Sequence, residues 1–345
     1  EIDNKAFESM VNYIRTHYRE KLYLGELSKR FYINLTYCCY LFNKNMGCNF
    51  TTFLMRVRME RAAELLTTTT MSVKQIAEYL VEHWWDELTD PQRDYPCDST
   101  LVSGVAKGDV EQKFADWTFV LDNVDISVAR KSVGKLYDLA YACEAANPSS
   151  NVFETFVELS QKYFYDPNSP MRNEDYYLPF VSRYASYEGL SEVERGRFER
   201  EARLCGLNMI GTKASDFRFA DKNGRMRNLY DIKAPYTLLF FSNPGCDACM
   251  NIINVLREDP VISSMVASGR LAVVNIYIDE DIHAWRSYMP VYPEEWYNGF
   301  DPDMILRSNE IYAIRAIPSL YLLDSEKRVI MKDAPEERLF RYLSS

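Results

Sequence analysis

The chain has 345 residues, of which 47% are hydrophobic and 26% are charged. This composition is typical of globular proteins and excludes collagen-like, fibrous and wholly disordered chains. The length predicts two or three domains. No apolar run approaches the roughly 18 residues of a membrane-spanning helix, so we expect no membrane span.

The charge is distributed unevenly along the chain. Residues 1–80 carry 11 Lys and Arg against 8 Asp and Glu, a net charge of +3, whereas the remainder carries −13. A basic end on an acidic body suggests that the two parts have different partners.

The first 80 residues are expected to be helical throughout. Apolar side chains recur at the 3.6-residue spacing of an amphipathic helix in residues 7–14 and again in residues 53–65. Strand patterns are absent from this region, which we therefore interpret as an all-α domain.

Residues 4–80 resemble the DNA-binding domain of AraC-type regulators. Leu24–Phe31 is similar to the scaffold of its first helix-turn-helix, and Asn34–Gly47 is similar to the first recognition helix. Phe50–Leu66 fits the long linker helix, and Met71–Ala77 fits the start of the second helix-turn-helix. The resemblance implies DNA as a partner, and the side chains that would reach the bases are Thr36, Tyr40, Asn43 and Lys44.

The second helix-turn-helix is incomplete. After Leu80 the family continues with Gly-Phe and a second recognition helix, whereas this chain continues with Val81-Glu82-His83-Trp84-Trp85. The pattern therefore changes near residues 71–82. Two interpretations stay open: residues 1–80 bind DNA through a single helix-turn-helix, or they are a helical remnant that no longer reads DNA.

Residues 81–207 are predicted to form a second all-α domain, and residues 208–345 an α/β domain. Helices are expected near Glu174–Tyr187 and Ser191–Cys205, the second starting with a capping box of Ser191 and Glu194. From residue 208 strands and helices alternate. The strands are expected at 216–219, 237–241, 271–278, 319–323 and 328–331, and the helices at 246–257, 304–312 and 336–343.

The cysteines exclude a disulfide scaffold and a zinc ribbon. There are eight in 345 residues, and only Cys246 and Cys249 have C-x-x-C spacing, without the second pair that a zinc ribbon needs. The three His are scattered along the chain, so we expect no metal site.

Cys246 and Cys249 are the candidate redox residues. The strand at 237–241 is expected to deliver Cys246 to the start of a helix, where the N–H groups and the helix dipole favour a thiolate. Cys249 follows one helical turn later, within reach of a mixed disulfide on Cys246. The spacing predicts a nucleophile, Cys246, and a shielded resolver, Cys249; the alternative is two buried structural cysteines.

Residues 208–345 resemble the thioredoxin superfamily, specifically the TlpA-type thiol–disulfide oxidoreductases. The resemblance rests on the C-x-x-C after a strand, on Ala316-Ile317-Pro318-Ser319 before a later strand, and on the opening Gly211–Phe217. It implies that Pro318 is cis and shapes the substrate side of the dithiol, with Gly245 and Ile317 as substrate-binding residues. It also implies protein thiols or disulfides as substrates, an upstream electron donor, and no cofactor.

Two further regions leave alternatives open. The aromatic segment His283–Phe300 is either a flap that faces the substrate or an insertion packed on the edge of the fold. Residues 78–205 resemble a helical domain of unknown function that precedes thioredoxin-like domains in envelope proteins of the Bacteroidetes type. That resemblance implies no chemistry, so the region is either a docking surface or a spacer.

The sequence thus predicts three domains, 1–80, 81–207 and 208–345, and a thiol–disulfide oxidoreductase. The alternatives are an AraC-type DNA-binding regulator with a redox-sensing or partner-binding domain, and an interaction protein with a degenerate thioredoxin fold. Residues 81–345 point to the periplasm or cell envelope, and a functional AraC-like segment would point to the cytoplasm.

Overall fold

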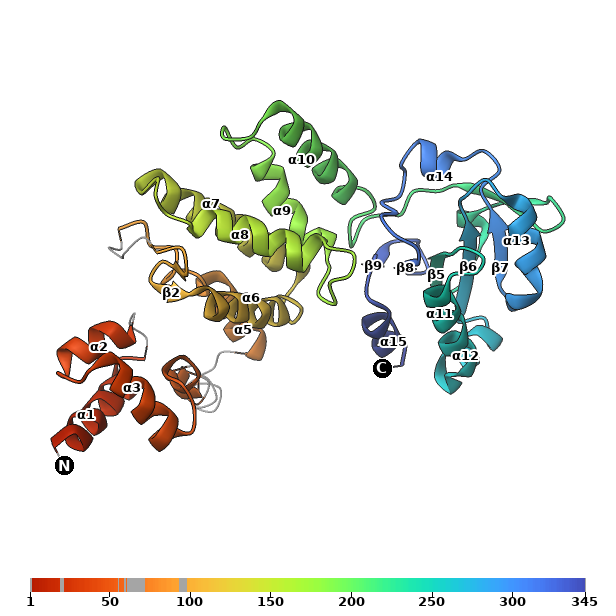
Figure 1. Cartoon of the computed structure of the whole chain (residues 1–345). Coiled ribbons are helices and arrows are strands. Elements are labelled where there is room, and N and C mark those ends of the chain that lie inside the picture. The colour runs from red at the N-terminus through yellow and green to blue at the C-terminus, as the bar shows by residue number, and fades with distance from the viewer. Residues whose placement is uncertain are drawn as a thin grey trace. The chain divides into compact units, whose positions relative to one another are not determined.

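The computed structural model describes residues 2–18, 22–54, 56–58, 60, 72–92 and 98–344. The chain divides into two compact units, residues 1–87 and residues 88–345, which we call the N-terminal and C-terminal units (Figure 1). Within the described residues, no helix combines the length and the apolar character that crossing a bilayer requires.

The N-terminal unit is helical, as predicted. Its elements are α1 (Ile2–Thr16), α2 (Leu24–Arg30), α3 (Leu35–Leu41), the π-helical turn η1 (Phe42–Met46) and α5 (Val73–His83). Residues 50–54 and 56–58 are also helical, and residues 61–71, which include the last six residues of the predicted linker helix, lie outside the described residues. Phe7 of α1 meets Phe42 edge to face at 4.9 Å in the buried core.

The side chain of Asn34 starts α3. Its carbonyl oxygen accepts the backbone N–H of Thr36 at 2.9 Å, which satisfies one of the amides that a helix start leaves unpaired. The tight connection from α2 to α3 contains Tyr32 at φ 55°. The Asn34 cap and the left-handed Tyr32 thus fix where α2 ends and α3 begins, which are the two helices of the predicted first helix-turn-helix.

The C-terminal unit begins with a helical part. Its helices are α6 (Lys107–Leu121), α7 (Ile126–Ala146), α8 (Val152–Ser160), α9 (Glu174–Tyr184) and α10 (Glu192–Cys205), with a π-helical turn η2 (Gln161–Tyr165) after α8. The predicted capping box of Ser191 and Glu194 at the start of α10 is confirmed. The expectation of helices alone was incomplete, because β1 (Leu101–Val102) and β2 (Val105–Ala106) form a short hairpin.

The sheet part follows, with seven strands in the order β4-β3-β7-β6-β5-β8-β9. The strands are β3 (Arg218–Asp221), β4 (Met226–Asn228), β5 (Tyr236–Phe241), β6 (Leu271–Tyr277), β7 (Tyr297–Phe300), β8 (Ser319–Leu323) and β9 (Val329–Lys332). The helices are α11 (Asp247–Glu258), α12 (Pro260–Ala267), α13 (Ile282–Tyr288), α14 (Ile305–Ser308) and α15 (Glu336–Ser344), with 3-10 turns η3 (Leu229–Asp231) and η4 (Met289–Val291). The predicted helix at 304–312 was too long, because α14 ends at Ser308 and Glu310 has a left-handed φ of 46°.

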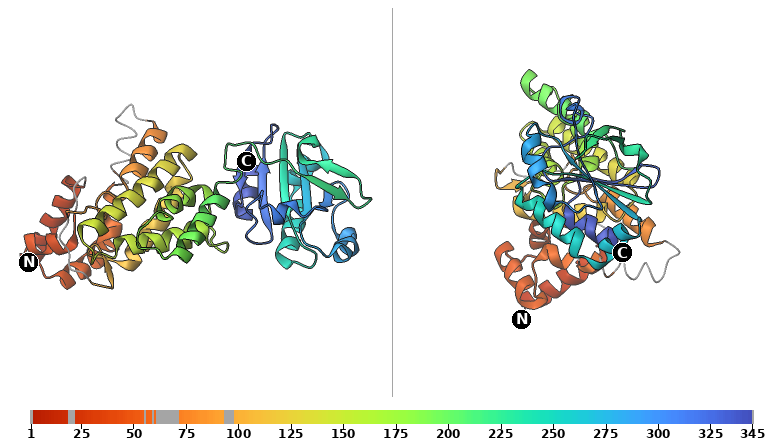
Figure 2. Two further views of the ribbon diagram at one scale, coloured as in Figure 1. Left: turned by 90° about the horizontal axis from the view of Figure 1, so that it is seen from above. Right: turned by 90° about the vertical axis from the view of Figure 1, so that its right-hand side faces the viewer.

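Both faces of the sheet are covered (Figure 2). Side chains alternate along β5, so Leu238 and Phe240 pack with α11, α12 and α15, whereas Leu239 and Phe241 pack on the opposite side with Leu306 of α14. Strand β5 is parallel to β6 and antiparallel to β8. The carboxyl end of β5 therefore lies beside the carboxyl end of β6 and the start of β8.

The aromatic segment 283–300 is part of this fold. Trp285, Tyr292 and Trp296 are buried in the same core as α11, and β7 is hydrogen-bonded between β3 and β6. The segment thus supplies buried side chains to the core and strand β7 to the sheet.

Candidate active site

The dithiol lies in the turn between β5 and α11. Gly245 has φ +72°, the left-handed conformation that glycine adopts without strain. Cys246 is the N-cap residue of α11, and its Sγ accepts the backbone N–H of Cys249 at 3.2 Å. The Cys246 sulfur thus lies beside the backbone amides that the first turn of α11 leaves without helical partners.

The two sulfurs differ in their access to solvent. Cys246 is partly exposed, whereas Cys249 is 1% exposed. Burial, and next the hydrogen bond from its thiol to Cys246, raise the pKa of Cys249 to about 12. Both are free thiols. Cys97 lies outside the described residues.

A chain of polar side chains holds the turn that carries the dithiol. Asn243 donates from its amide to Asp279 at 2.8 Å, and Ser242 is hydrogen-bonded to Asn275 of β6. Asn275 in turn donates to Asn298 of β7 at 3.0 Å. The sequence reasoning missed these residues, although two buried asparagines in otherwise apolar strands were a readable signal.

Pro318 and Ile317 lie at the same end of the sheet. The Ile317–Pro318 peptide is cis, as the thioredoxin resemblance implied. Ser319, the next residue, is paired with Phe241 at the end of β5, five positions before Cys246. Ile317 and Cys246 both pack against the core cluster that contains Cys249.

The candidate DNA-contacting residues lie on α3 and η1 in the N-terminal unit. Thr36 and Tyr40 lie on α3, Asn43 and Lys44 lie on η1, and all four are exposed. The Lys44 ammonium lies 5.4 Å from the centre of the Tyr40 ring. After α5 the described residues 84–89 form turns, so they provide no second recognition helix.

The described ranges contain no group of three or more His, Cys, Asp and Glu side chains arranged to hold a metal ion.

Comparisons with known proteins agree with this architecture. A solved structure of a thioredoxin-like protein from Bacteroides caccae is 35% identical, covers 80% of this chain and 94% of its own, and superposes with a TM-score of 0.67. The chain belongs to this family of thioredoxin-like proteins. Two family models match the other regions: the domain of unknown function DUF5106 at residues 62–206, and the helix-turn-helix domain at residues 27–80.

Two further solved structures match only the C-terminal part of the present chain. One is the C-terminal domain of an uncharacterized protein from Bacteroides fragilis, 40% identical over 40% of this chain and 99% of its own, with a TM-score of 0.39. The other is a domain of a possible thiol-disulfide isomerase from Cytophaga hutchinsonii. It is 25% identical, covers 40% of this chain and 93% of its own, and superposes with a TM-score of 0.35. No curated protein matches the chain.

The multidomain architecture predicted from the sequence is confirmed: helical N-terminal and middle regions precede a thioredoxin-like α/β region. The AraC-type resemblance of the N-terminal part is confirmed by the helix-turn-helix match. The domain boundaries at 80/81 and 207/208 and the individual site residues stay predictions.

Proposed function

We propose that this thioredoxin-like protein is a thiol–disulfide oxidoreductase whose active group is the dithiol of Cys246 and Cys249. The observation that supports this most strongly is the partly exposed Cys246 at the N-cap of α11, with the Cys249 thiol buried one turn further along. The thiolate is the nucleophilic form of a cysteine in disulfide exchange.

The proposed cycle needs only the two sulfurs of the chain. The Cys246 thiolate attacks a substrate disulfide, which forms a mixed disulfide and releases one substrate sulfur as a thiolate that takes up a proton. Cys249 then loses its proton and attacks the Cys246 sulfur, so that the intramolecular disulfide forms and the second substrate thiol leaves. Two electrons pass to the substrate, and an upstream dithiol returns them; the reverse sequence oxidises a substrate dithiol.

In this proposal the burial of Cys249 ensures that Cys246 reacts with the substrate first and Cys249 reacts second. Because its pKa is raised to about 12, the Cys249 thiol stays protonated at neutral pH while Cys246 meets the substrate. Pro318 shapes the substrate side of the site, and Gly245 and Ile317 contact the substrate chain. No cofactor is required, since the dithiol carries both electrons.

The test is turnover of insulin disulfides with dithiothreitol as reductant. Wild-type protein is expected to accelerate the reaction, and Cys246→Ser is expected to abolish the acceleration. Cys143→Ser is the matched control, because Cys143 is a buried cysteine on α7, away from the dithiol turn. Equal rates for wild type and Cys246→Ser would refute the proposal.

A second proposal concerns residues 1–80, which we propose bind DNA through the α2–α3 helix-turn-helix. It is supported by the helix-turn-helix match and by the exposed Thr36, Tyr40, Asn43 and Lys44. Retention of genomic fragments should fall steeply as salt rises from 50 to 200 mM, because phosphate contacts release counterions. Absence of any retained fragment at low salt would exclude this function.

The two proposals place the protein in different compartments. The redox function would place it in the periplasm or cell envelope, and DNA binding would place it in the cytoplasm. Cell fractionation followed by detection of the full chain distinguishes them.

A further inference from the structure

A pocket of about 330 Å³ lies in the sheet part, at the end of β5 that is remote from the dithiol. Its lining contains one carboxylate, Glu326, and four cationic side chains, those of Lys213, Lys233, Lys327 and Arg328. Lys327 donates to the hydroxyl of Thr237, the second residue of β5, at 3.0 Å, whereas the dithiol follows the carboxyl end of that strand. The pocket is therefore separate from the candidate active site.

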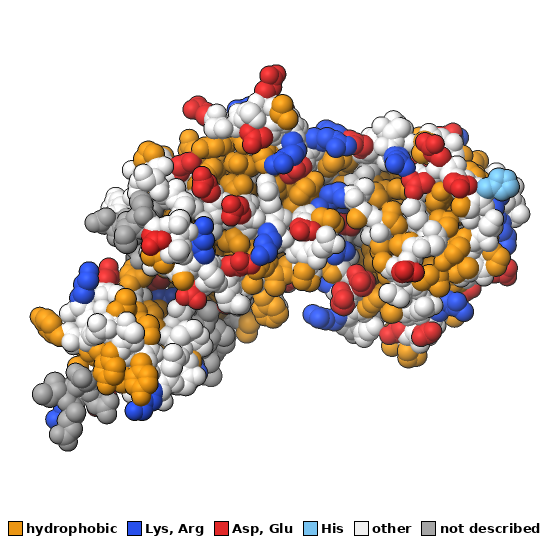
Figure 3. All heavy atoms as spheres, in the orientation of Figure 1, with side chains coloured by type: hydrophobic (Ala, Val, Ile, Leu, Met, Phe, Trp, Pro, Cys, Tyr) orange, Lys and Arg blue, Asp and Glu red, His pale blue; other side chains and the backbone are white. Residues whose placement is uncertain are grey.

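Most of the positive charge in this pocket has no counter-charge in the protein. Arg328 pairs with Glu326 at 3.1 Å. The Lys213 ammonium lies 4.3 Å from the centre of the Tyr230 ring, and Lys233 donates to the Tyr230 carbonyl at 2.8 Å. Within the described part of the chain, none of the three lysines forms an ion pair. On the face in Figure 3, by contrast, basic and acidic side chains of the C-terminal unit are interspersed.

Lys327 occupies a backbone position that lysine rarely adopts. Its N–H donates to the Asp324 carbonyl at 3.0 Å, and the Asp324 N–H donates to the Arg328 carbonyl at 2.9 Å, which closes a three-residue turn between β8 and β9. The φ of Lys327 is 64°, the left-handed conformation for which such turns usually use glycine. The Asp324 carboxylate accepts the backbone N–H groups of Glu326 and Arg328. The turn thus carries a lysine where local preference favours glycine, and the lysine side chain points inward to Thr237.

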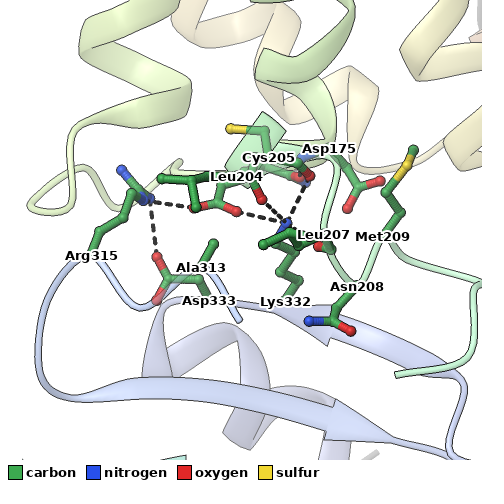
Figure 4. A network of polar contacts seen from close by, with 12 residues as sticks. Asp175, Leu204, Cys205, Leu207, Asn208, Met209, Ala313, Arg315, Lys332 and Asp333 are labelled. Carbon is green, nitrogen blue, oxygen red and sulfur yellow. Dashed lines mark hydrogen bonds and ion pairs between the residues drawn. The ribbon is translucent and has the colours of Figure 1, made fainter. Parts of the chain in front are cut away.

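A second buried lysine of the sheet part shows how this protein neutralises such a charge (Figure 4). Lys327 and Lys332 are each 4% exposed. Lys332 of β9 lies 2.8 Å from Glu174 of α9 and donates to the carbonyl of Cys205 at 2.8 Å. Glu174 also pairs with Arg315, so these contacts form a buried network that joins the helical and sheet parts.

Lys327 has no comparable set of partners. Among the described residues its ammonium has one hydrogen-bond acceptor, the hydroxyl of Thr237. Burial, and next the neighbouring Lys233, lower the pKa of Lys327. Lysine is rarely buried without a charged partner, because removing the ammonium from water is costly. A negatively charged group in the pocket would provide that partner.

The charge and size of the pocket indicate which anion fits. Four cations against one carboxylate give the lining a net charge of +3, which favours a doubly charged group over a monocarboxylate. A phosphate monoester carries nearly two negative charges at neutral pH and offers three acceptor oxygens. The volume lies at the lower end of the range of about 300–1,000 Å³ for small-molecule sites. The lysine methylene stems and the Tyr230 ring offer apolar surface to the rest of such a molecule.

We propose that this pocket binds a small phosphorylated molecule, whose phosphate oxygens accept hydrogen bonds from Lys213, Lys233 and Lys327. This binding site is separate from the dithiol and does not depend on the proposed redox function.

The test is calorimetric titration of the full chain with phenyl phosphate, benzoate and inorganic phosphate at constant ionic strength. Benzoate presents the same ring with a single negative charge, and inorganic phosphate presents the charge without a ring. Phenyl phosphate should bind at least about tenfold more tightly than either, a difference of about 1.4 kcal/mol or more. An affinity for phenyl phosphate no greater than that for benzoate or inorganic phosphate would overturn the proposal.

Substitutions distinguish this pocket from other lysines of the surface. Lys327→Met removes the buried ammonium, keeps an unbranched side chain, and should weaken phenyl phosphate binding about tenfold. Lys222→Gln is the matched control, because Lys222 is exposed in the turn between β3 and β4 and lies outside the lining; its affinity should equal that of wild type.

A double variant covers the case in which Lys327→Met does not fold. Lys213→Gln with Lys233→Gln changes two exposed side chains of the lining and should weaken binding by about tenfold or more. Wild-type affinity in either pocket variant, or equal weakening in Lys222→Gln, would contradict the assignment of the site.

Discussion

Replacing Glu174 with glutamine tests the buried network that joins the helical and sheet parts. The Glu174 side chain is 1% exposed, as is that of its partner Lys332, and Arg315 is 11% exposed. Glutamine keeps the shape of the side chain but removes its charge, which leaves two buried cations without their shared carboxylate. Breaking a buried ion pair in this way costs about 3–5 kcal/mol.

The contacts that Glu174→Gln leaves intact should keep the loss of folding free energy in the lower part of that range. Lys332 keeps its hydrogen bonds to the carbonyls of Cys205 and Leu207, and Arg315 keeps Asp333. We therefore expect a loss of about 3 kcal/mol. For a unit of this size that corresponds to a fall of roughly 6–12 °C in the melting temperature.

The assay is thermal unfolding of the full chain followed by circular dichroism, with Glu111→Gln as control. Glu111 pairs with Lys162 at 2.6 Å, a similar distance, but the two side chains are 39% and 61% exposed. Exposed pairs contribute at most about 1 kcal/mol. Equal, small shifts in the two variants would refute the argument that burial makes the Glu174 pairs important.

Three further predictions follow from single residues. Iodoacetamide at pH 8 should label Cys246 before Cys249, whose pKa burial raises to about 12; equal labelling by peptide mass mapping would contradict this. Burial also raises the pKa of Tyr292 to about 12, so the folded state keeps a proton that an unfolded tyrosine loses. The free energy of unfolding should therefore fall from about pH 10 to pH 12, and less so in Tyr292→Phe, as denaturant titrations at several pH values can show. Gly245→Ala should cost about 1–2 kcal/mol in the same titrations, because φ is +72° and a Cβ there meets no other atom. Gly108→Ala, equally open but in the first turn of α6, should be neutral or stabilising.

The dithiol turn could be predicted from the sequence because its signals are local. The apolar residues of β5, a glycine with a left-handed φ, and two cysteines one helical turn apart lie within 15 consecutive residues. The hydrogen bond from the Cys249 amide to the Cys246 sulfur then completes the helix start. The same is true of the Ser191 capping box and of the Asn34 cap of α3.

Strand β7 could not be predicted in the same way. It reads Tyr297-Asn298-Gly299-Phe300, and asparagine and glycine are both depleted in strands. Gly299 is required by tertiary packing, because a Cβ there would lie 2.4 Å from the ring of Phe219 on β3. Propensity was thus overridden by a neighbour that is distant in the sequence.

The buried network of Glu174, Arg315 and Lys332 could not be predicted from local sequence patterns either. Glu174 and Arg315 are 141 positions apart and come from the helical and sheet parts. In the sequence, Glu174 looks like an ordinary acidic residue of a first helical turn, and Lys332 looks like a surface lysine at the end of an edge strand. Only the packing of the two parts shows that they are buried together.

The most direct test of the redox proposal is to trap its covalent intermediate. In Cys249→Ser the mixed disulfide formed on Cys246 has no resolving thiol, so incubation with bis(2-hydroxyethyl) disulfide should yield a stable adduct. Peptide mass mapping should place one mercaptoethanol on Cys246, and Cys246→Ser should carry none at that position. An adduct confined to other cysteines, such as the exposed Cys39, would contradict the proposal that Cys246 is the nucleophile.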